Sequence, residues 1–475
     1  MQQARRENVP ATGKASGNRM QNVGETAAAS PASAGYRRYM LVLLTAGFGL
    51  NLLDRQIINV LAEAIKHDLR LADWQLGALT GLSFALLYSV VALPIARLAD
   101  RGNRVRIIGF AVLGWSVFTA CCGMAASFVQ LLAFRIGVGI GEAGCSPPSQ
   151  SLIADVYPLS KRSGALGIFG AGSPVGAAIG LAAGGLLAET VGWRWTLILA
   201  GLPGVIIGLL VLFTLREPRN TSQGFVRPQS VPISGLFRRI AVQRAFIFLT
   251  LGISLLSFMN VGAMAFATSF YLRLHRPELT AFGSYFGLGP TAVIGLGLGL
   301  MGATAGGAGT AIGGWLGNRW ATRNMRAYAL IPAVGSCAAA LGYLIMFSVP
   351  SGVFSLVSFL VPAFFSNLWN GPGTVALQNL AGYRYKATAM AIVLFVTSVL
   401  GLGLGPLTIG LISDALRPNL GTAHALQTAI LIAVTVGFAS AFCHWFASLS
   451  IKRELESLRD AADPLVDAAA AVVTD

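Results

Sequence analysis

Residues 39–65 read YMLVLLTAGFGLNLLDRQIINVLAEAI. The run is apolar and long enough to cross a bilayer as a helix, yet it carries the adjacent charges Asp54 and Arg55. An ionisable side chain near the hydrocarbon centre costs roughly 3 kcal/mol on insertion scales, so such groups usually mark working sites. The stretch therefore predicts a membrane-spanning helix that contributes charged groups to a functional site.

A second apolar run, residues 128–155, carries Arg135 and Glu142. These two side chains are seven residues apart, about two helical turns, so they share one helix face about 10 Å apart along the axis. The remaining apolar runs carry no charge near the middle of the membrane. All four intramembrane charges thus lie in the first third of the chain.

The composition is that of an integral membrane protein. Of the 475 residues, 55% are hydrophobic and only 11% are charged, whereas soluble domains carry about 25% charged residues. The net charge of +15 does not indicate nucleic-acid binding, because Lys and Arg are spread over the segments between apolar runs. The five cysteines lie in apolar runs without metal-site or disulfide spacing, and no Ser/His/Asp set is credible. We therefore expect no enzyme activity, no metal and no cofactor.

Apolar runs of membrane-spanning length form two groups of six. They cover residues 39–65, 75–98, 105–126, 128–155, 163–188 and 195–215, and then 244–270, 282–312, 326–348, 351–380, 386–413 and 422–449. We predict an all-α membrane protein with twelve transmembrane helices in two pseudo-symmetric six-helix bundles, 39–215 and 244–449. A cytoplasmic linker at 216–243 joins the bundles, a disordered tail at 1–38 precedes them and a second tail at 450–475 follows.

The distribution of basic residues predicts the orientation. With the N-terminus inside, 26 of the 34 Lys and Arg residues fall in cytoplasmic segments and six fall on the opposite side. This bias places both termini in the cytoplasm.

The two halves also resemble one another in sequence. Residues 96–101, Ala-Arg-Leu-Ala-Asp-Arg, match residues 314–319, Gly-Trp-Leu-Gly-Asn-Arg, at the same place in each half. A second match runs at a constant offset of 225 residues and pairs Gly176, Gly180, Gly185 and Leu186 with Gly401, Gly405, Gly410 and Leu411. Two related halves are the plan of a transporter whose site lies at their interface, where kinks such as Gly289-Pro290 and Asn370–Gly373 often serve gating.

Residues 98–104, Leu-Ala-Asp-Arg-Gly-Asn-Arg, resemble the cytoplasmic GxLaDRxGR signature of the major facilitator superfamily. Ala96 and Asn103 replace two glycines of that signature, and because Asn tolerates a left-handed backbone we expect the turn to be kept. The second copy has Asn318 in place of the acid, which suggests a weaker charged latch there.

Within the superfamily, the chain resembles the spinster branch. The resemblance rests on Leu53-Asp54-Arg55, on the Asp-Arg-x-Asn-Arg loop, and on RIGVGIGEAG at 135–144 with its continuation through Pro147-Pro148 to residues 152–158. It implies movement of sphingoid or lysophospholipid-type lipids and, for bacterial members of the inner membrane, coupling to protons. The Asp54-Arg55 element is also similar to that of organic-anion symporters, so this alternative stays open.

The four intramembrane charges are the candidate proton-coupling and headgroup site. Asp54 cannot face its neighbour Arg55 on one helix, so we expect it to find a cation on another helix, with Arg135 the obvious candidate. A carboxylate balanced between burial and a nearby cation can take up a proton on one side and release it on the other. Asp54 and Glu142 are therefore predicted proton carriers, and Arg55 and Arg135 ligands of a phosphate or carboxylate headgroup. The alternative is a fixed ion-pair network.

A cytoplasmic gate is predicted from the charged residues that follow the second and fourth spans. By the same resemblance it forms an inter-helix latch of the outward-facing state, although topology signals alone would give a similar pattern. Its members are Asp100, Arg101, Arg104, Asp155 and Arg162.

The C-terminal half offers neutral polar and aromatic side chains instead of intramembrane charges. The candidate substrate contacts are Asn260, Asn367, Asn370, Phe258 and Trp369. A cavity with one charged and one apolar wall suits an amphipathic molecule, although each aromatic ring could equally pack against lipid or other helices.

The sequence thus predicts a monomeric, multi-pass secondary transporter that works by alternating access on the proton gradient. Its expected substrate is an amphipathic lipid, preferably a lysophospholipid or sphingoid lipid. A proton symporter of small organic anions is the alternative, and a receptor without flux is a remote third.

Overall fold

The computed structural model describes residues 33–82, 90–91, 94–95, 98–99, 102–218, 240, 242–321, 323–382 and 385–460. Within these residues every regular element is a helix. The gate candidates Asp100 and Arg101, most of the predicted tail 1–38, most of the linker 216–243, and the tail beyond residue 460 lie outside them.

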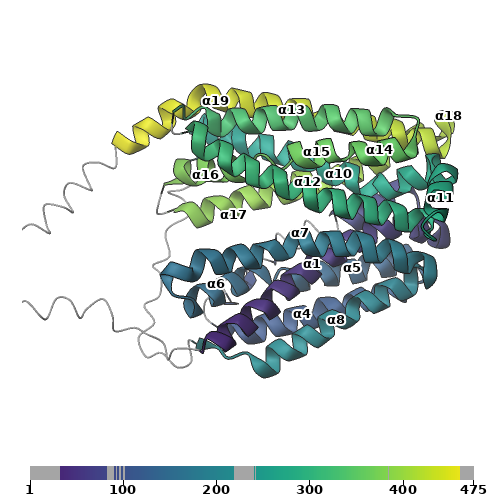
Figure 1. Ribbon diagram of the computed structural model, residues 1–475, viewed down its shortest axis with the longest axis horizontal. Coiled ribbons are helices and arrows are strands. Elements are labelled where there is room, and N and C mark those ends of the chain that lie inside the picture. The colour runs from purple at the N-terminus through teal and green to yellow at the C-terminus, as the bar shows by residue number, and fades with distance from the viewer. Residues whose placement is uncertain are drawn as a thin grey trace, which may run out of the picture.

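The first half of the chain folds into one helical bundle (Figure 1). Its elements are α1 (Ala34–Leu69), α2 (Asp73–Gly77), the π-helical η1 (Ala78–Leu82), α4 (Arg104–Gly123), α5 (Phe128–Glu142), α6 (Ser146–Val156), α7 (Leu159–Thr190) and α8 (Gly192–Thr214). The first helix begins at Ala34, five residues inside the predicted tail, because Ser33 caps it by accepting a hydrogen bond from the Tyr36 amide. Asn103 also acts as an N-cap, for α4, and its φ of −81° is not the left-handed turn expected from the signature.

The second half forms the other bundle. Its elements are α10 (Arg244–Leu274), α11 (Arg276–Ser284), α12 (Pro290–Ala321), α13 (Ala327–Ser348), α14 (Gly352–Ser358), α15 (Leu360–Phe365), α16 (Asn370–Ala381), α17 (Lys386–Thr397), the π-helical η4 (Ser398–Gly403), α18 (Leu404–Val434) and α19 (Val436–Asp460). Gly289-Pro290 starts α12 instead of kinking a helix, because proline is suited to the first helical position. The last helix runs eleven residues into the predicted tail, from 450 to 460.

Ten segments of the described residues are long and apolar enough to cross a membrane. The last of them, Thr388–Leu458, covers two of the predicted spans, and the predicted span 75–98 is described only in parts. The predicted all-helical membrane fold is confirmed.

The repeat predicted at an offset of 225 residues is a structural repeat. Gly176 of α7 lies against Gly49 of α1. Gly401 of η4, just before α18, lies against Ser257 of α10. A Cβ atom on Gly185 would lie 2.6 Å from the Thr291 carbonyl oxygen of α12, in the other bundle. Its counterpart Gly410 is just as close to α2, again across the boundary between the bundles. Each half therefore uses its glycines in the same way.

Among the described residues, the closest contacts between the two bundles lie toward one end of the molecule. We call the end where α1 begins and α19 ends the terminal face, and the opposite end, which carries α11, the distal face (Figure 1). In the distal half α7 crosses α12, and α2 and η1 pack on α18. Nearer the terminal face, a Cβ atom on Gly167 of α7 or on Gly307 of α12 would meet nothing within 4 Å. Among the described residues, α7 and α12 are therefore in close contact at the distal face, and these two glycines mark where that close contact has ended.

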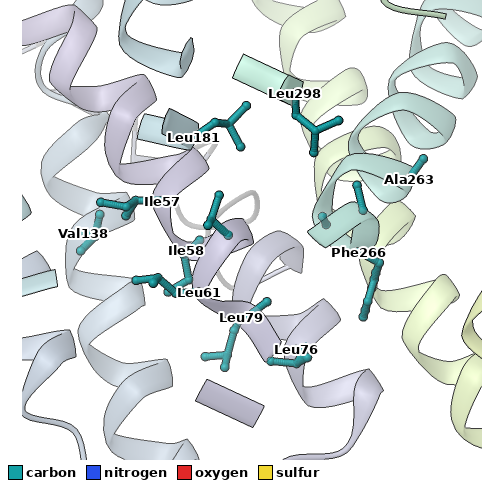
Figure 2. Close-up of a cluster of buried hydrophobic side chains, with 14 of the residues drawn as sticks. Ile57, Ile58, Leu61, Leu76, Leu79, Val138, Leu181, Ala263, Phe266 and Leu298 are labelled. Atoms are coloured by element: carbon teal, nitrogen blue, oxygen red, sulfur yellow. The ribbon is translucent and has the colours of Figure 1, made fainter. Parts of the chain in front are cut away.

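An apolar layer fills the boundary beneath the distal face. Figure 2 shows Ile58, Leu61 and Leu79 of the first bundle in one cluster with Phe266 and Leu298 of the second. All are buried. The layer separates the middle of the molecule from the distal face.

Candidate functional site

The central cluster consists of Asp54, Arg55, Thr119, Arg135 and Glu142, all in the first bundle. Asp54, near the middle of α1, is 3% exposed, and Glu142, the last residue of α5, is fully buried. The Thr119 hydroxyl of α4 donates a hydrogen bond of 3.1 Å to Asp54 Oδ2. The Asp54 Oδ1 atom is buried and has no hydrogen-bond partner among the described residues. Asp54 is therefore a half-satisfied carboxyl group inside a membrane protein.

The ion pair of the central cluster joins Arg55 and Glu142. Arg55 Nε lies 2.8 Å from Glu142 Oε2, and the Arg55 side chain is 23% exposed. Arg135 was the partner expected for Asp54, but the described residues contain no ion pair between these two. Arg135 remains close enough to interact electrostatically with Asp54 and Glu142.

The predicted substrate residues of the second bundle form two separate polar groups. The Tyr343 hydroxyl of α13 donates to Asn260 Oδ1 of α10. Asn370 donates to Asn367 Oδ1 at 3.1 Å and to Thr310 Oγ1 of α12 at 3.2 Å. Phe258 and Trp369 are partly buried and pack against the main apolar core. The structure brings Asn367 and Asn370 together but does not bring them to Asn260.

A second charged cluster closes the distal face, and sequence reasoning missed it. The distal clamp consists of Glu63, Lys66 and Asp73 from the first bundle and Arg273 and Ser413 from the second. The Arg273 guanidinium bonds both Glu63 oxygens, at 2.8 and 2.9 Å, and both Asp73 oxygens, also at 2.8 and 2.9 Å. Lys66 and the Ser413 hydroxyl complete the shell of Asp73. Five of the clamp's hydrogen bonds thus cross from one bundle to the other.

The surroundings of Asp73 keep it charged. Burial alone would raise the pKa of its carboxyl group, but the bonds from Arg273 and Lys66 outweigh burial and hold the pKa well below its usual range. The clamp is therefore ionic at any pH near neutrality.

Two carboxylates cap helices of the opposite bundle, again at the distal face. Glu189 of α7 accepts hydrogen bonds from the backbone amides of Gly289, Thr291 and Ala292 at the start of α12, at 2.7–3.2 Å. Asp414 of α18 accepts from the amides of Asp73 and Trp74 at the start of α2, at 3.1 and 2.8 Å. A carboxylate satisfies free amides at a helix N-terminus and complements its dipole. Positions 189 and 414 are 225 residues apart. They follow the last glycine pair of the repeat, Gly185 and Gly410, by four residues, so extending the comparison of the halves would have paired them.

The described gate residues gather around Arg104 within the first bundle. Arg104 is fully buried, and its guanidinium bonds Glu217 at 2.6 Å, Asp155 at 2.6 Å and Ser151 at 2.9 Å. Glu217 follows α8, and its place in this cluster was not predicted. It lies in the predicted linker, where charged residues are common and carry little signal. Arg162 lies on α7, and its buried Nε atom has no hydrogen-bond partner among the described residues.

Comparison with solved structures identifies the same architecture. The chain superposes with a TM-score of 0.78 and 30% identity on a bacterial homologue of the human lysosomal transporter spinster, in an inward-facing and unoccupied conformation. The match covers 89% of this chain and 99% of that one.

Two relatives match over most of the chain. An MFS-type efflux pump of Mycolicibacterium smegmatis is 30% identical over 86% of this chain and 91% of its own length. A sphingosine-1-phosphate transporter of Danio rerio is 24% identical over 84% of this chain and 80% of its own length.

A family model also matches most of the chain. The model described as Major Facilitator Superfamily matches residues 44–406, well over half of the chain. Together with the two-bundle fold, this match makes the chain a membrane transporter. It belongs to the Major Facilitator Superfamily, and its relatives there include spinster proteins and efflux pumps.

Proposed function

We propose that this protein is a proton-coupled secondary transporter that moves an amphipathic lipid of the lysophospholipid or sphingoid class by alternating access. The observation that carries the proposal is the Asp54 carboxyl group, buried in the first bundle with one oxygen unpaired. An ionised carboxylate without full hydrogen bonding is costly in an apolar medium, and taking up a proton removes that cost. A group in this setting is suited to binding a proton in one state and releasing it in the other.

The neighbours of Asp54 support its role as the main carrier. Glu142 is held by the Arg55 ion pair, so its protonation would have to break that bond, whereas protonation of Asp54 breaks none. We assign Glu142 as a secondary proton site, exchanged when Arg55 turns to a headgroup. Arg55 and Arg135 supply donors for a phosphate or carboxylate group.

The lipid class is supported by the two unlike walls and by the relatives. The first bundle offers charges, and the second offers Asn260, the pair Asn367 and Asn370, and the rings of Phe258 and Trp369. A headgroup would bind the first wall and an acyl chain the second. The spinster relatives, one of them a sphingosine-1-phosphate transporter, favour the same class.

We further propose that the terminal face is cytoplasmic in the inner membrane of a bacterium. The bias of basic residues toward that side supports this orientation. The conformation described above is then inward-facing. In it, the residues around Arg104 form the cytoplasmic latch.

The test is flux in proteoliposomes that hold the purified protein, with an imposed pH gradient and a fluorescent lysolipid. We expect Asp54→Asn to abolish gradient-driven uphill movement while substrate exchange without a gradient persists. The control is Asp68→Asn, the same chemical change on the same helix at a side chain that is 48% exposed. Uphill lysolipid movement in Asp54→Asn at the unmodified rate would refute the proton role.

A symporter of small organic anions is the second candidate. A probable L-galactonate transporter of Escherichia coli is 34% identical over 180 residues, 38% of this chain. The same liposomes given a sugar acid decide between the two. Gradient-driven uptake of the acid together with no lysolipid movement would establish the symporter and exclude the lipid function.

A further inference from the structure

A basic cavity lies at the distal face, beside the clamp and away from the central cluster. The distal vestibule has a volume of about 600 Å³. Its lining includes the end of α1, the end of α10, the start of α12 and the turn within α18. Five cationic side chains line it: Lys66, Arg70, Arg273, Arg276 and Arg417.

The charges around the vestibule do not balance. Arg273 and Lys66 bind the clamp carboxylates Glu63 and Asp73. The other three, Arg70, Arg276 and Arg417, have no carboxylate within 4.0 Å among the described residues. Three uncompensated cations around one cavity repel one another, and an anion between them would relieve that repulsion.

The gathering of these cations is not explained by membrane topology. Only six Lys and Arg residues were assigned to the side opposite the termini, where the positive-inside rule predicts few. Five of those six line the distal vestibule, and the sixth, Arg194, pairs with Asp68 outside it. Topology accounts for a small number of cations on this side but not for their convergence on one cavity.

The backbone at Arg70 gives a second, independent observation. Arg70 caps the end of α1 with φ 53° and ψ 46°, and among the described residues it is the only non-glycine residue with positive φ. Glycine or asparagine normally occupies this helix-ending position, because a Cβ atom makes the left-handed conformation costly. Strain that persists in a structure points to a function for the side chain held there.

We propose that the distal vestibule binds a phosphate-type anion that bridges the two bundles. Guanidinium groups suit this ligand because their planar donors match phosphate oxygens in pairs. Lys66 and Arg70 come from the first bundle, and Arg273, Arg276 and Arg417 come from the second. A ligand held by both sets binds the distally closed state better than the open one, so it shifts the population toward closure. This site is separate from the proposed substrate site and does not rest on the proposed function.

The test measures the distal gap, which is the separation of the two bundles at the distal face. It uses full-length protein whose native cysteines have been replaced. Spin labels at Val191→Cys, on the α7–α8 turn, and Phe282→Cys, on α11, report the separation of the bundles. In detergent, inorganic phosphate should increase the closed population. The triple variant Arg70→Gln, Arg276→Gln, Arg417→Gln should need at least about tenfold more phosphate, a loss of about 1.4 kcal/mol. Arg194→Gln, a cation of the same face outside the vestibule, should respond like the unmodified protein.

Two further arms identify the source of the phosphate group. Closure in nanodiscs of phosphatidylglycerol, but not phosphatidylcholine, without free phosphate would assign the site to an anionic lipid headgroup. Closure by free phosphate alone would assign it to a soluble anion. An equal response to chloride at matched ionic strength, or an unchanged phosphate response in the triple variant, would overturn the proposal, because either result reduces the effect to screening.

Discussion

Arg104 shows how one buried cation can join two helices, α4 and α6, to the segment that follows a third, α8. Its side chain has no exposed surface, and it bonds a fully buried acid, Glu217, and a partly exposed acid, Asp155. The backbone amide of Arg104 also donates to Glu217. Removing one member of a buried ion pair leaves the other charge uncompensated, which costs about 3–5 kcal/mol. The two acids should therefore differ in their effect on stability.

We expect Glu217→Gln to lower the thermal denaturation temperature in detergent much more than Asp155→Asn. The reason is that Glu217 is 1% exposed and Asp155 is 36% exposed, so water compensates only the second loss. Equal losses for the two acids would contradict this account.

At the scale of elements, the approach of α7 to α12 depends on Gly185. A Cβ atom there would lie 2.6 Å from a backbone carbonyl oxygen of the other bundle, so it can be placed only if the helices move apart. Membrane helices commonly use small residues for such close approach. The distal closure therefore depends on one missing methyl group.

Gly185→Ala should shift the molecule toward states that are open at the distal face. Spin-label distances between α7 and α11 would show a larger share of long separations than in the unmodified protein. Gly114→Ala is the matched control, because a Cβ atom at Gly114 of α4 would meet nothing within 4 Å. A distance distribution that Gly185→Ala leaves unchanged would show that the helices absorb the methyl group elsewhere.

The two carboxylate caps should each contribute to the same closure. Loss of a helix cap costs about 1 kcal/mol, so Glu189→Gln and Asp414→Asn should each raise the ratio of distally open to closed molecules about fivefold. Because they cap different helices, α12 and α2, the double variant should show nearly the product of the two effects. Glu456→Gln, on the surface of α19, serves as the control. A double variant no more open than either single variant would mean that the caps act on one shared step.

At the scale of the whole molecule, the distal clamp decides which pH-dependent events can open the transporter. A carboxyl group with a depressed pKa contributes stability that is present above its unfolded value, about 3.9, and is lost only as the pH falls through the lower folded value. The pKa of Asp73 is depressed because its bonds with Arg273 and Lys66 outweigh its burial. Asp73 therefore stays ionised throughout the range from pH 7 to pH 5.

Acidification from pH 7 to pH 5 should leave the distal gap closed in the Asp54→Asn variant, because Asp73 stays ionised over this range. Asp73→Asn should open the gap already at pH 7. Spin-label distances recorded over this pH range test both statements. Opening of Asp54→Asn near pH 6 would show that a group other than Asp54 senses the proton.

The patterns in the sequence predicted the overall fold but not the contacts between helices. Apolar runs and the glycine repeat predicted the helices and the two related halves, because span length and close packing depend on local composition. The buried charges Asp54, Arg55, Arg135 and Glu142 were also found from composition alone. Their pairing was not, because it depends on how α1, α4 and α5 rotate against one another. The partnership of Arg55 with Glu142 and the Thr119 hydrogen bond exist only in the assembled bundle.

The distal residues were missed for a related reason. Glu63, Asp73 and Arg273 lie near span ends, where charges are common and carry little signal by themselves. Only their meeting across the boundary between the bundles makes them a clamp. The repeat that pairs positions 189 and 414 is present in the sequence. The prediction used only its glycine and leucine positions, so it did not reach these two acids.

Burial of the distal clamp also affects the rate of the transport cycle. In each cycle Arg273 must separate from Glu63 and Asp73, become hydrated, and later lose that water again. Breaking several strong bonds before new ones form makes a barrier dominated by enthalpy. We therefore expect reorientation of the carrier, not substrate binding, to limit the turnover number. The rate should rise steeply with temperature, and variants with a weakened clamp should be faster in the cold.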